Sequence, residues 1–423
     1  MKIMVVGGGG REHAIIKKLK ESPLVDKIYA LPGNGGISED AECVNIGAKD
    51  IEGIVAFAID KKIDYAIVAP DDPLVLGAVD ALTDAGISCF GPHANAAIIE
   101  GSKIFSKNLM KKYGIPTAKY EVFTSKDEAL KYLADAPIPT VIKADGLALG
   151  KGVVIALTRK EAEDAVKLMM EDKVFGESGS KIVIEEFLSG PEVSVLSFTD
   201  GKTVVPMISS MDHKRALDGD NGLNTGGMGT IAPNPYYTSD IAECCMKEIF
   251  LPTINAMNSE GRTFKGCLYF GLMLTEDGPK VIEYNCRFGD PETQVVLPLL
   301  KSDLLQIMMA CTNGTLADAN VEFIDKSACC VVMASEGYPA KYNSGYEITR
   351  DSDIGGEVYF AGARLADGKI LTAGGRVLGV VAIGDTLEDA INKSYQNVSK
   401  VHFENAFYRK DIGKRAMLVF NQK

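Results

Sequence analysis

Apolar residues over the first hundred positions alternate between short runs and helical stripes. The run at 3–6 is typical of a buried strand, and the apolar residues between 14 and 19 then recur at helical spacing. The alternation continues with runs at 28–31, 65–69 and 87–90 and with a helical stripe at 51–59. This order predicts a doubly wound parallel sheet, whose ligands bind beyond the carboxyl ends of its strands.

The pattern changes after about residue 101 to a mixture of helices, strands and hairpins. We expect helices at 102–113, 127–133 and 238–257, strands at 119–123, 140–144, 153–157 and 182–188, and hairpins at 193–207 and 267–285. Asp-Gly pairs mark the turns of both hairpins. The last hundred residues combine hairpin signals with a helix at 387–400 and predict a small α+β domain.

The second strand of the hairpin at 267–285 is expected to place three polar residues on one face. Successive side chains of a strand point to opposite faces, so Glu283, Asn285 and Arg287 should line up. A carboxylate and an amide oxygen suit Mg²⁺ bound with nucleotide phosphates, and the guanidinium suits the phosphates themselves. Alternation alone favours a different interpretation, in which these residues form the solvated face of the hairpin.

A run of glycines, Gly7 to Gly10, follows the first predicted strand and leads into the first helix. Glycine lets backbone amides approach a phosphate closely, and the helix adds its positive N-terminal dipole. A dinucleotide site would need Gly-x-Gly-x-x-Gly and an acid after the second strand, where Leu31 and Pro32 stand instead. NAD binding is therefore not expected. A phosphate-bearing substrate and a structural tight turn remain the two alternatives.

A second glycine-rich segment, 143–152, ends in Gly-Lys-Gly and leads into a strand. A Walker loop would end in Gly-Lys-Ser/Thr and begin a helix, so we expect a hairpin tip instead. Gly146, Gly150 and Gly152 would let this tip fold over a polyphosphate, and Lys143 and Lys151 would neutralise it. A flexible surface hairpin with solvated lysines is the alternative.

Two further stretches complete the candidate site. The strand at 182–188 ends in acids, so its edge could hold an adenine through backbone hydrogen bonds, with Glu192 available for ribose hydroxyls. The segment 211–229 is rich in glycine and charge and has no helical or strand period. A loop of this length is uncommon unless it is functional or disordered, and its mixed charges favour function.

Composition restricts the class of protein. The 423 residues require two to four domains, and 46% hydrophobic and 24% charged residues are typical of a soluble globular protein. A net charge of −12 argues against a nucleic-acid partner. The nine cysteines form no Cys-x-x-Cys motif, and no signal peptide or membrane span is evident. We expect a cytoplasmic protein without a membrane or nucleic-acid partner.

Taken together, the loops resemble the ATP-grasp superfamily and, within it, the phosphoribosylamine–glycine ligase (glycinamide ribonucleotide synthetase) family. The segments that match are Gly8-Gly-Gly-Arg-Glu-His-Ala14, Pro32-Gly-Asn34, Glu100-Gly-Ser-Lys103, Val141-Ile-Lys-Ala-Asp-Gly-Leu-Ala148, Gly150-Lys-Gly152, Asp212-His-Lys-Arg215, Asn224-Thr-Gly-Gly-Met-Gly229 and Asn285-Cys-Arg-Phe-Gly-Asp-Pro-Glu292. Departures occur at Asp71-Asp-Pro73, Pro191, Leu223 and Ile231-Ala232, and none removes a residue assigned to catalysis.

The resemblance implies three domains and a defined reaction. A Rossmann-like domain would span 1–101, an ATP-grasp domain 102–322 with a mobile subdomain at about 117–190, and a small α+β domain 323–423. ATP, Mg²⁺ or Mn²⁺, glycine and 5-phosphoribosylamine would give glycinamide ribonucleotide, ADP and phosphate through a glycyl phosphate, in purine biosynthesis. We expect a monomer.

The resemblance also implies roles for individual residues. Glu283 and Asn285 would bind the metal, and Arg287, Lys214 and Asp212 would act in catalysis. The implied ATP contacts are Lys103, Lys143, Gly146, Gly150, Lys151, Gly152, Glu185, Glu186, Leu188 and Glu192. The implied substrate contacts are Gly8, Gly9, Gly10, Asn34, Asn224, Thr225, Gly226, Gly227 and Asp290.

One departure concerns the metal. Many ATP-grasp enzymes carry a second metal carboxylate on the preceding strand, whereas 268–273 contains no acid here. Glu283 should therefore carry more of the metal binding. His213 could relay a proton or have no catalytic role. The rival functions are another ATP-grasp ligase that uses formate or bicarbonate, a nucleotide-dependent oxidoreductase and a non-catalytic nucleotide sensor.

Overall fold

The N-terminal domain of the computed structural model, which describes residues 1–147, 152–172 and 176–420, is a parallel sheet covered on both faces. Its strands lie in the order β3-β2-β1-β4-β5, and every pairing is parallel. The elements are β1 (Lys2–Gly7), α1 (Gly10–Leu19), β2 (Lys27–Pro32), β3 (Glu42–Cys43), α2 (Ile51–Lys61), β4 (Tyr65–Val68), α3 (Asp71–Val75), α4 (Ala78–Asp84), β5 (Cys89–Phe90) and α5 (Ala94–Gly101). The predicted doubly wound sheet is confirmed.

Strand β1 is buried on both faces, which explains its continuous apolar run. Ile3 and Val5 pack with α1 in one core, whereas Met4 and Val6 pack with α2 in the other. The loop that joins β1 to α1 therefore lies between two packed layers at the carboxyl end of the sheet.

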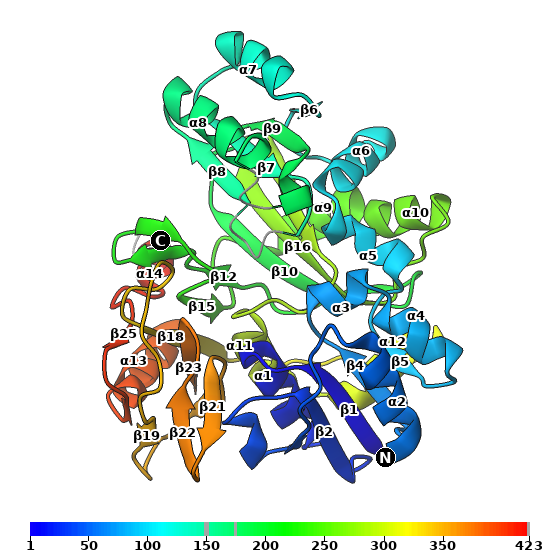
Figure 1. Cartoon of the computed structure of the whole chain (residues 1–423), viewed down its shortest axis with the longest axis vertical. Coiled ribbons are helices and arrows are strands. Elements are labelled where there is room, and N and C mark those ends of the chain that lie inside the picture. Colours follow the sequence, from blue (N-terminus) through cyan, green and yellow to red (C-terminus); the bar gives the residue numbers. More distant parts are fainter. Residues whose placement is uncertain (148–151, 173–175, 421–423) are drawn as a thin grey trace.

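A small subdomain stands at the top of the molecule (Figure 1). It is an antiparallel sheet in the order β6-β9-β7-β8, and two helices pack against it around an apolar core that includes Ile142, Ile184 and Val166. Its elements are β6 (Tyr120–Phe123), α7 (Lys126–Asp135), β7 (Thr140–Ala144), β8 (Val153–Ala156), α8 (Arg159–Met170) and β9 (Ile182–Glu186). Helix α6 (Lys103–Tyr113) leads into it from α5.

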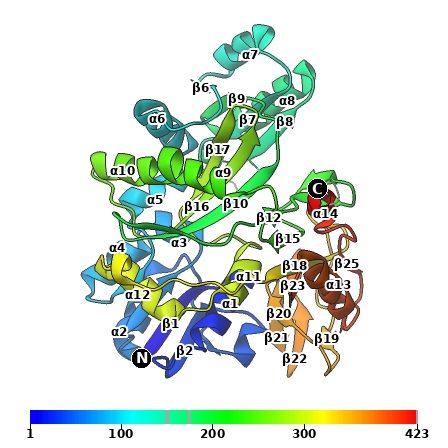
Figure 2. The same ribbon diagram turned by 180° about the vertical axis from the view of Figure 1, so that it is seen from behind.

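The central sheet carries the hairpin that the sequence singled out. Its order is β11-β10-β16-β17, with β10 (Glu192–Thr199), β11 (Val204–Pro206), β16 (Gly266–Thr275) and β17 (Gly278–Asn285). Helices α9 (Ser239–Cys245) and α10 (Leu251–Ser259) cover one face (Figure 2). Phe250, which lies between them in the chain, packs against Phe270 with ring centroids 4.2 Å apart. The expected helix at 238–257 is thus two helices joined by a π-helical turn, Met246–Phe250.

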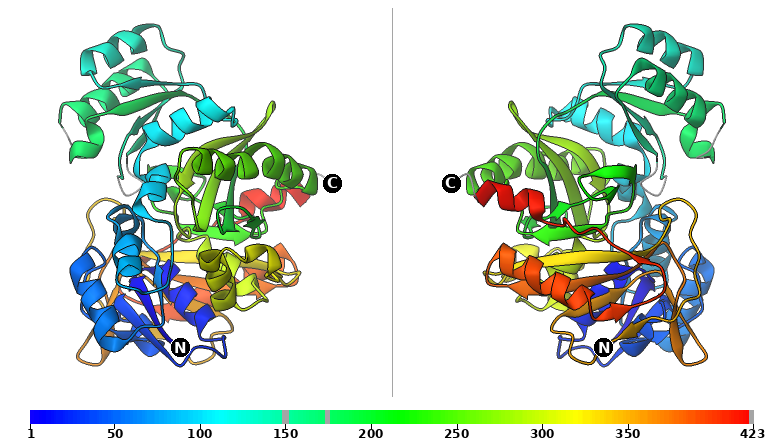
Figure 3. Two further views of the ribbon diagram at one scale, coloured as in Figure 1. Left: turned by 90° about the vertical axis from the view of Figure 1, so that its right-hand side faces the viewer. Right: turned by 90° about the vertical axis from the view of Figure 1, so that its left-hand side faces the viewer.

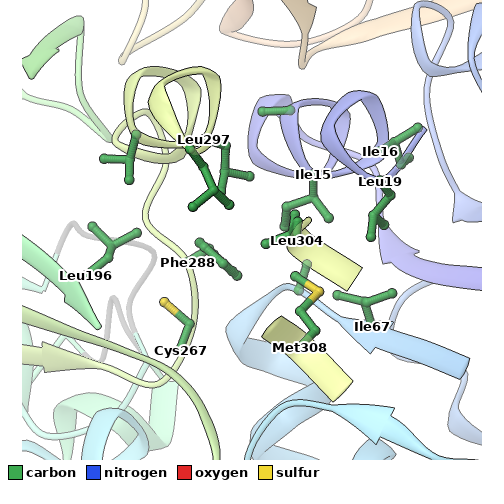
Figure 4. Packing of buried hydrophobic residues seen from close by; sticks show 14 of the residues in the cluster. Ile15, Ile16, Leu19, Ile67, Leu196, Cys267, Phe288, Leu297, Leu304 and Met308 are labelled. Atoms are coloured by element: carbon green, nitrogen blue, oxygen red, sulfur yellow. The ribbon is translucent and has the colours of Figure 1, made fainter. Parts of the chain in front are cut away.

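The C-terminal end of the central region packs onto the N-terminal sheet. Helices α11 (Thr293–Val296) and α12 (Leu304–Asn313) lie beside α1, and Leu304 and Met308 of α12 share a core with Ile15 of α1 (Figure 4). Phe288 lies in the same core. The two domains are therefore joined by a continuous apolar interior rather than by a flexible linker.

The third sheet holds a correction to the sequence analysis. The segment 211–229, for which no strand was predicted, contains β12 (Met211–Asp212), β13 (Arg215–Leu217) and β14 (Asn221–Asn224) and leads into β15 (Gly229–Ala232). Strand β15 pairs with β18 (Ser327–Ser335), so the sheet of the C-terminal region begins with β12 and β15 from the middle of the chain. Strand β12 pairs with β15, and the other partner of β15 is β18, far along the chain, which local periodicity cannot reveal.

The remaining elements complete the C-terminal domain beside the N-terminal one (Figure 3). The sheet order is β12-β15-β18-β23-β20, and β25 also pairs with β18. The elements are β19 (Thr349–Arg350), β20 (Glu357–Phe360), β21 (Ala363–Ala366), β22 (Lys369–Thr372), β23 (Arg376–Gly384), α13 (Leu387–Val398), β24 (Val401–His402), β25 (Ala406–Phe407) and α14 (Lys414–Phe420). Asn34 and His13 hydrogen-bond to the backbone of Phe360, which ties this domain to the N-terminal loops.

Candidate active site

The β16–β17 hairpin sets the orientation of the predicted metal ligands. Its register places Gly271 opposite Glu283, and a bulge follows at Gly271. Val281 and Tyr284 point into the core, which leaves Glu283 and Asn285 on the other face. A Cβ at position 271 would come within 2.9 Å of Cγ of Glu283, so this position has no room for a second carboxylate unless Glu283 moves.

Arg287 is held by Glu100, a residue that the sequence analysis did not assign to the site. Arg287 Nη2 lies 3.0 Å from Glu100 Oε1, and both side chains are largely buried. The amide of Cys286 donates to Glu100 Oε2 at 2.7 Å. When the Asn285 amide is oriented so that its nitrogen faces Glu100, this nitrogen donates to Glu100 Oε1 at 2.9 Å. The amide oxygen then points away from the Glu100 carboxylate.

This arrangement decides between the two interpretations of the hairpin. Burial acts to lower the pKa of Arg287, but Glu100 and Asp71 outweigh it and raise that pKa above its ordinary value. Burial also raises the pKa of Glu100, despite the nearby guanidinium. A buried ion pair is not a solvated hairpin face. Glu100 belongs to the matched segment Glu100-Gly-Ser-Lys103, which is the signal that could have identified it.

Three lysines surround Glu283. Lys214 Nζ lies 3.6 Å from Glu283 Oε1 and 3.4 Å from Glu192 Oε2. Burial acts to raise the pKa of Glu283, but Lys214, Lys143 and Lys103 outweigh it and hold the pKa below its ordinary value. Glu192 raises the pKa of Lys214 most, and Glu283 adds to this effect. The structure thus brings together the predicted metal ligand, two predicted ATP lysines and one predicted catalytic lysine.

Helix α6 begins at this cluster. The Ser102 hydroxyl caps the helix by accepting from the Phe105 amide, and it donates to Asp145 Oδ1 at 2.9 Å. The Ile104 amide also donates to Asp145 Oδ1, at 2.8 Å. These bonds fix Lys103 against the end of β7, and burial lowers the pKa of its ammonium.

The predicted adenine edge contains a buried ion cluster. Glu185 lies between Lys143 and Lys107, and each ammonium is 3.0 Å from one of its carboxylate oxygens. Lys107 was not assigned to the site from the sequence. Glu186 accepts from the Lys119 amide at 2.9 Å, and Leu188 follows the end of β9. The Glu185 side chain therefore faces the lysines, and its carbonyl accepts from the Thr140 hydroxyl at 2.8 Å. Strand β9 is paired on both sides, by β6 and β7, so Glu185 does not lie on a free strand edge and its adenine contact stays a prediction.

The glycine-rich segment 143–152 is described only in part. Gly146 packs so tightly against Ser178 that a Cβ would come within 2.3 Å of the hydroxyl oxygen. Gly152 is buried and its carbonyl accepts from the Ala144 amide at 2.8 Å, which closes the β7–β8 hairpin. The predicted contacts Gly150 and Lys151 lie outside the described residues.

The β1–α1 glycine loop is a tight turn. The Gly9 amide donates to Glu12 Oε2 at 2.6 Å, and a Cβ at Gly8 would come within 2.3 Å of the Gly33 carbonyl oxygen. The Gly9 amide thus has a protein partner, contrary to the simple expectation that it faces a phosphate. A Cβ at Gly10 would come within 2.7 Å of Gln294 Nε2. Close packing, within the N-terminal domain at Gly8 and Gly9 and against the central region at Gly10, is a sufficient reason for glycine at these positions.

Asn34 also has partners within the protein. Its Nδ2 donates to the carbonyls of Gly8 and Phe360, and its Oδ1 accepts from the amides of Gly36 and Ile37. Both polar atoms of the Asn34 side chain thus have partners, and Nδ2 joins the N-terminal loops to the C-terminal domain. A substrate contact by Asn34 stays a prediction.

The other predicted substrate residues meet around Arg376, which comes from the C-terminal domain. Arg376 Nη1 donates to the carbonyls of Gly226 at 2.7 Å and Asp290 at 3.1 Å, and Nη2 lies 3.4 Å from Asp290 Oδ1. A Cβ at Gly9 would lie 3.4 Å from Asp290 Oδ2. Three distant segments thus converge here, and Arg376 was not identified from the sequence because nothing near it in the chain marks a site.

The loop that carries Asn224 and Thr225 is fixed mainly by Thr225. Its amide and hydroxyl both donate to the Lys214 carbonyl at 2.8 Å, and its hydroxyl oxygen accepts from the Gly227 amide. Gly227 adopts a φ of +113°, and a Cβ there would clash with Asp212. The loop therefore presses directly on a predicted catalytic carboxylate.

Asp212 lies near a second buried carboxylate, Glu292. Burial, together with Glu292, raises the pKa of Asp212 well above its ordinary value. Burial also raises the pKa of Glu292, and Tyr269 donates to its Oε1 at 3.3 Å. Two neighbouring carboxylates in a dry environment favour retention of a proton between them.

His213 points away from this pair. Its Nδ1 lies 3.1 Å from the Gly229 carbonyl oxygen, and its Nε2 lies 3.1 Å from the Gly413 amide nitrogen. Burial lowers the pKa of His213 to about 4. A neutral ring that donates to the Gly229 carbonyl and accepts from the Gly413 amide satisfies both contacts. These contacts favour a structural role for His213 over proton relay.

The donor set suits a hard cation bound with phosphates. The described residues contain no group of three or more His, Cys, Asp and Glu side chains that could hold a metal by themselves. Glu283 and Asn285 supply oxygen ligands beside three lysines. Magnesium commonly uses one or two carboxylates and completes its shell with substrate phosphates and water. The residues present therefore fit a metal–nucleotide complex.

Sequence comparisons cover nearly the entire chain. Three models of the phosphoribosylglycinamide synthetase family match this chain. The model of the N domain matches residues 1–100, that of the ATP-grasp (A) domain residues 101–293, and that of the C domain residues 328–415. A phosphoribosylamine–glycine ligase of Caldanaerobacter subterraneus is 50% identical over 97% of this chain and 99% of that protein. One of Clostridium acetobutylicum is 48% identical over 98% of this chain and all of that protein.

Solved structures agree with this result. The crystal structure of phosphoribosylamine–glycine ligase from Thermotoga maritima has a TM-score of 0.84 at 34% identity and covers 97% of this chain and all of that one. The biotin carboxylase domain of Hydrogenobacter thermophilus 2-oxoglutarate carboxylase, solved with MgADP and bicarbonate, has a TM-score of 0.75 at 16% identity. The match covers 96% of this chain and 91% of that one. At that identity the second likeness shows the fold alone.

Proposed function

The chain belongs to the phosphoribosylglycinamide synthetase family, and we propose that the cluster around Glu283 and Arg287 is its active site. As a member of this family the protein is a phosphoribosylamine–glycine ligase, which joins glycine to 5-phosphoribosylamine with ATP in purine biosynthesis. The resemblance stated from the motifs is thereby confirmed. Cytoplasmic location, oligomeric state and the identity of the metal stay predictions.

The observation that carries the site proposal is the convergence of Lys103, Lys143 and Lys214 on Glu283. Phosphoryl transfer needs positioned cations rather than a nucleophilic side chain, because charge develops on the phosphate oxygens. We assign Lys103 and Lys143 to the nucleotide phosphates. Glu283 and Asn285 would hold Mg²⁺ or Mn²⁺, which when bound neutralises phosphate charge.

The first step in this proposal forms a glycyl phosphate. A carboxylate oxygen of glycine attacks the γ-phosphorus of ATP, the bond to the β-phosphate oxygen breaks, and ADP leaves. Arg287 is fixed by Glu100 and offers its guanidinium to the transferring phosphoryl group. Lys214 compensates the charge between Glu192 and Glu283.

The second step forms the amide. The amine nitrogen of 5-phosphoribosylamine attacks the activated carbonyl, phosphate leaves, and the nitrogen loses a proton. Asp212 lies against Gly227 and near Glu292, and a single proton shared by this pair leaves one carboxylate ionised. That ionised carboxylate is the base that we assign to accept the proton. Asp290, Asn224 and Thr225 would face the phosphoribosylamine, and closure of the glycine loops would keep water from the acyl phosphate.

The test is an ADP-release assay with freshly generated phosphoribosylamine. ADP should appear only when glycine, phosphoribosylamine and ATP are all present, and it should be accompanied by glycinamide ribonucleotide. Formate and bicarbonate serve as alternative co-substrates. ADP release driven by either of them in place of glycine would contradict the assignment.

A further inference from the structure

Two buried lysines share one carboxylate at the nucleotide side of the site. Lys107 Nζ lies 3.0 Å from Glu185 Oε2, and Lys143 Nζ lies 3.0 Å from Oε1. The side chains of Lys107 and Glu185 are each 3% exposed and that of Lys143 is 10% exposed. One lysine would neutralise this carboxylate, and burying a second ammonium has a large desolvation cost. The second lysine therefore requires an explanation.

The two lysines are attached differently. Lys107 also donates to the Thr117 hydroxyl at 2.8 Å, and that hydroxyl donates to the Val281 carbonyl at 2.7 Å. Its ammonium lies 5.7 Å from the centre of the Tyr120 ring. These contacts come from the start of the small subdomain and from β17, so Lys107 is fixed where the subdomain meets the central sheet.

Lys143 is attached more loosely and lies nearer the phosphate-binding cluster. Its ammonium donates to the Ile282 carbonyl at 2.9 Å, one residue before Glu283. Glu185 Oε1 lies near Lys143 but receives no hydrogen bond of good geometry from the part of the chain that the structure describes. The ion pair between Lys143 and Glu185 is thus the more easily broken of the two.

We infer that Lys107 is a positioning residue that keeps Glu185 paired when Lys143 turns toward the nucleotide phosphates. This inference rests on the proposed function, which assigns Lys143 to those phosphates. Without Lys107, the departure of Lys143 would leave a buried carboxylate without a counter-ion, and this penalty would hold Lys143 in place. Lys107 thus promotes ATP binding without touching ATP.

The protonation of Lys107 gives a pH-dependent signature. Burial, together with Lys143, lowers its pKa to about 8, although Glu185 acts in the opposite direction. As the pH rises above about 8, Lys107 loses its proton and Glu185 keeps only Lys143, so the KM for ATP should rise. The titratable and charged groups that face Lys107 are Glu185 and Glu186 of β9, Lys143 of β7, Tyr120 of β6 and Lys111 of its own helix.

The experiment uses steady-state kinetics of the full-length enzyme with four variants. Lys107→Met should raise the KM for ATP by about tenfold or more at pH 7.5 and leave the KM for glycine unchanged. Glu185→Gln with Lys107→Met should bring the KM for ATP back to within about threefold of wild type, because the departure of Lys143 toward ATP then leaves no buried carboxylate without a partner. Lys107→Arg should keep a low KM and remove its rise above pH 8, since arginine does not titrate there. Lys111→Met, on the exposed side of the same helix, is the matched control.

Two results would overturn the inference. The first is an unchanged KM for ATP in Lys107→Met. The second is an equal loss for all substrates that the double variant does not restore, which would identify a merely structural role. Calorimetric binding of ATP to the same variants separates this inference from the proposed function. If the wild type releases no glycine-dependent ADP, the proposed function fails, while the ATP affinities still test Lys107.

Discussion

The guanidinium of Arg287 lies 3.0 Å from the carboxylate of Glu100, and this contact joins the end of β17 to the end of α5. The same carboxylate accepts from the Cys286 amide and, at 2.9 Å, from the Asn285 side chain. One acid thus orients the predicted phosphate contact and one predicted metal ligand. Because Glu100 is buried and acts through other residues, it is a positioning residue rather than a catalytic one.

Glu100→Gln should lower kcat by about 10²–10³-fold, because Arg287 loses the charge that holds it in place. The variant keeps the shape of the side chain, so circular dichroism should show an unchanged fold. Steady-state ADP release measures the effect. Glu121→Gln, on an exposed position of β6, is the control and should match wild type. Near-normal turnover in Glu100→Gln would remove Glu100 from this role.

Glu283→Gln should lower kcat by about 10²–10³-fold. It should also raise the Mg²⁺ concentration needed for half-maximal activity. The structural reason is that Gly271 stands opposite Glu283 and leaves no room for a second carboxylate that could substitute for it. Magnesium titration of the activity is the measurement. Asp277→Asn, in the exposed turn of the same hairpin, is the control. An unchanged magnesium requirement would contradict the assigned metal role.

Arg376→Met should raise the KM for phosphoribosylamine by about 10–100-fold, since hydrogen bonds that involve a charged group contribute roughly 1.5–3 kcal/mol each. The guanidinium joins Gly226 to Asp290, so its loss should loosen the predicted substrate loop and leave the nucleotide side intact. The KM for ATP should therefore change little. Arg364→Met on the exposed face of β21 is the control. An equal rise in both KM values would show that Arg376 supports the whole site instead.

Acid stability should depend on the contact between Asp411 and Arg409. Burial acts to raise the pKa of Asp411, but the hydrogen bond from Arg409 outweighs it and lowers the pKa from 3.8 to about 2. Because the folded pKa lies below the unfolded value, this stabilisation is present above about pH 4 and is lost as the pH falls toward 2. Because Asp411 is only partly buried, solvent screening reduces this stabilisation at neutral pH to about 1 kcal/mol or less.

The difference in free energy of unfolding between wild type and Asp411→Asn should therefore shrink as the pH falls from 5 to 2.5. Urea denaturation followed by circular dichroism at each pH measures this difference. Asp84→Asn, an exposed change at the end of α4, should show no such trend. A difference that stays constant over this range would show that the protonation of Asp411 is not linked to folding. The contact matters for the site because Arg409 also pairs with Asp220 next to β14, at 2.9 Å.

Much of the fold could be predicted from local pattern. Helix α7 was expected at 127–133 and spans Lys126–Asp135, and β16 was expected to begin at 267 and begins at Gly266. These elements have a strong period and clear turn or capping residues, so neighbouring positions carry the information. The segment 211–229 could not be predicted in the same way, because β12 and β15 are strands only through their place in the sheet with β18.

The sequence by itself determined the parallel sheet, the hairpin with Glu283 and Asn285, and the ligase family, because periodicity and motif spacing are local properties. Only the tertiary structure decided that Glu100 holds Arg287, that Lys107 shares Glu185 with Lys143, and that Arg376 reaches Asp290 from the C-terminal domain. These charged contacts join residues that lie between 42 and 187 positions apart in the chain, and a charge in isolation does not reveal its partner. Burial selects that partner, because a charge removed from water is stable only when an opposite charge lies beside it.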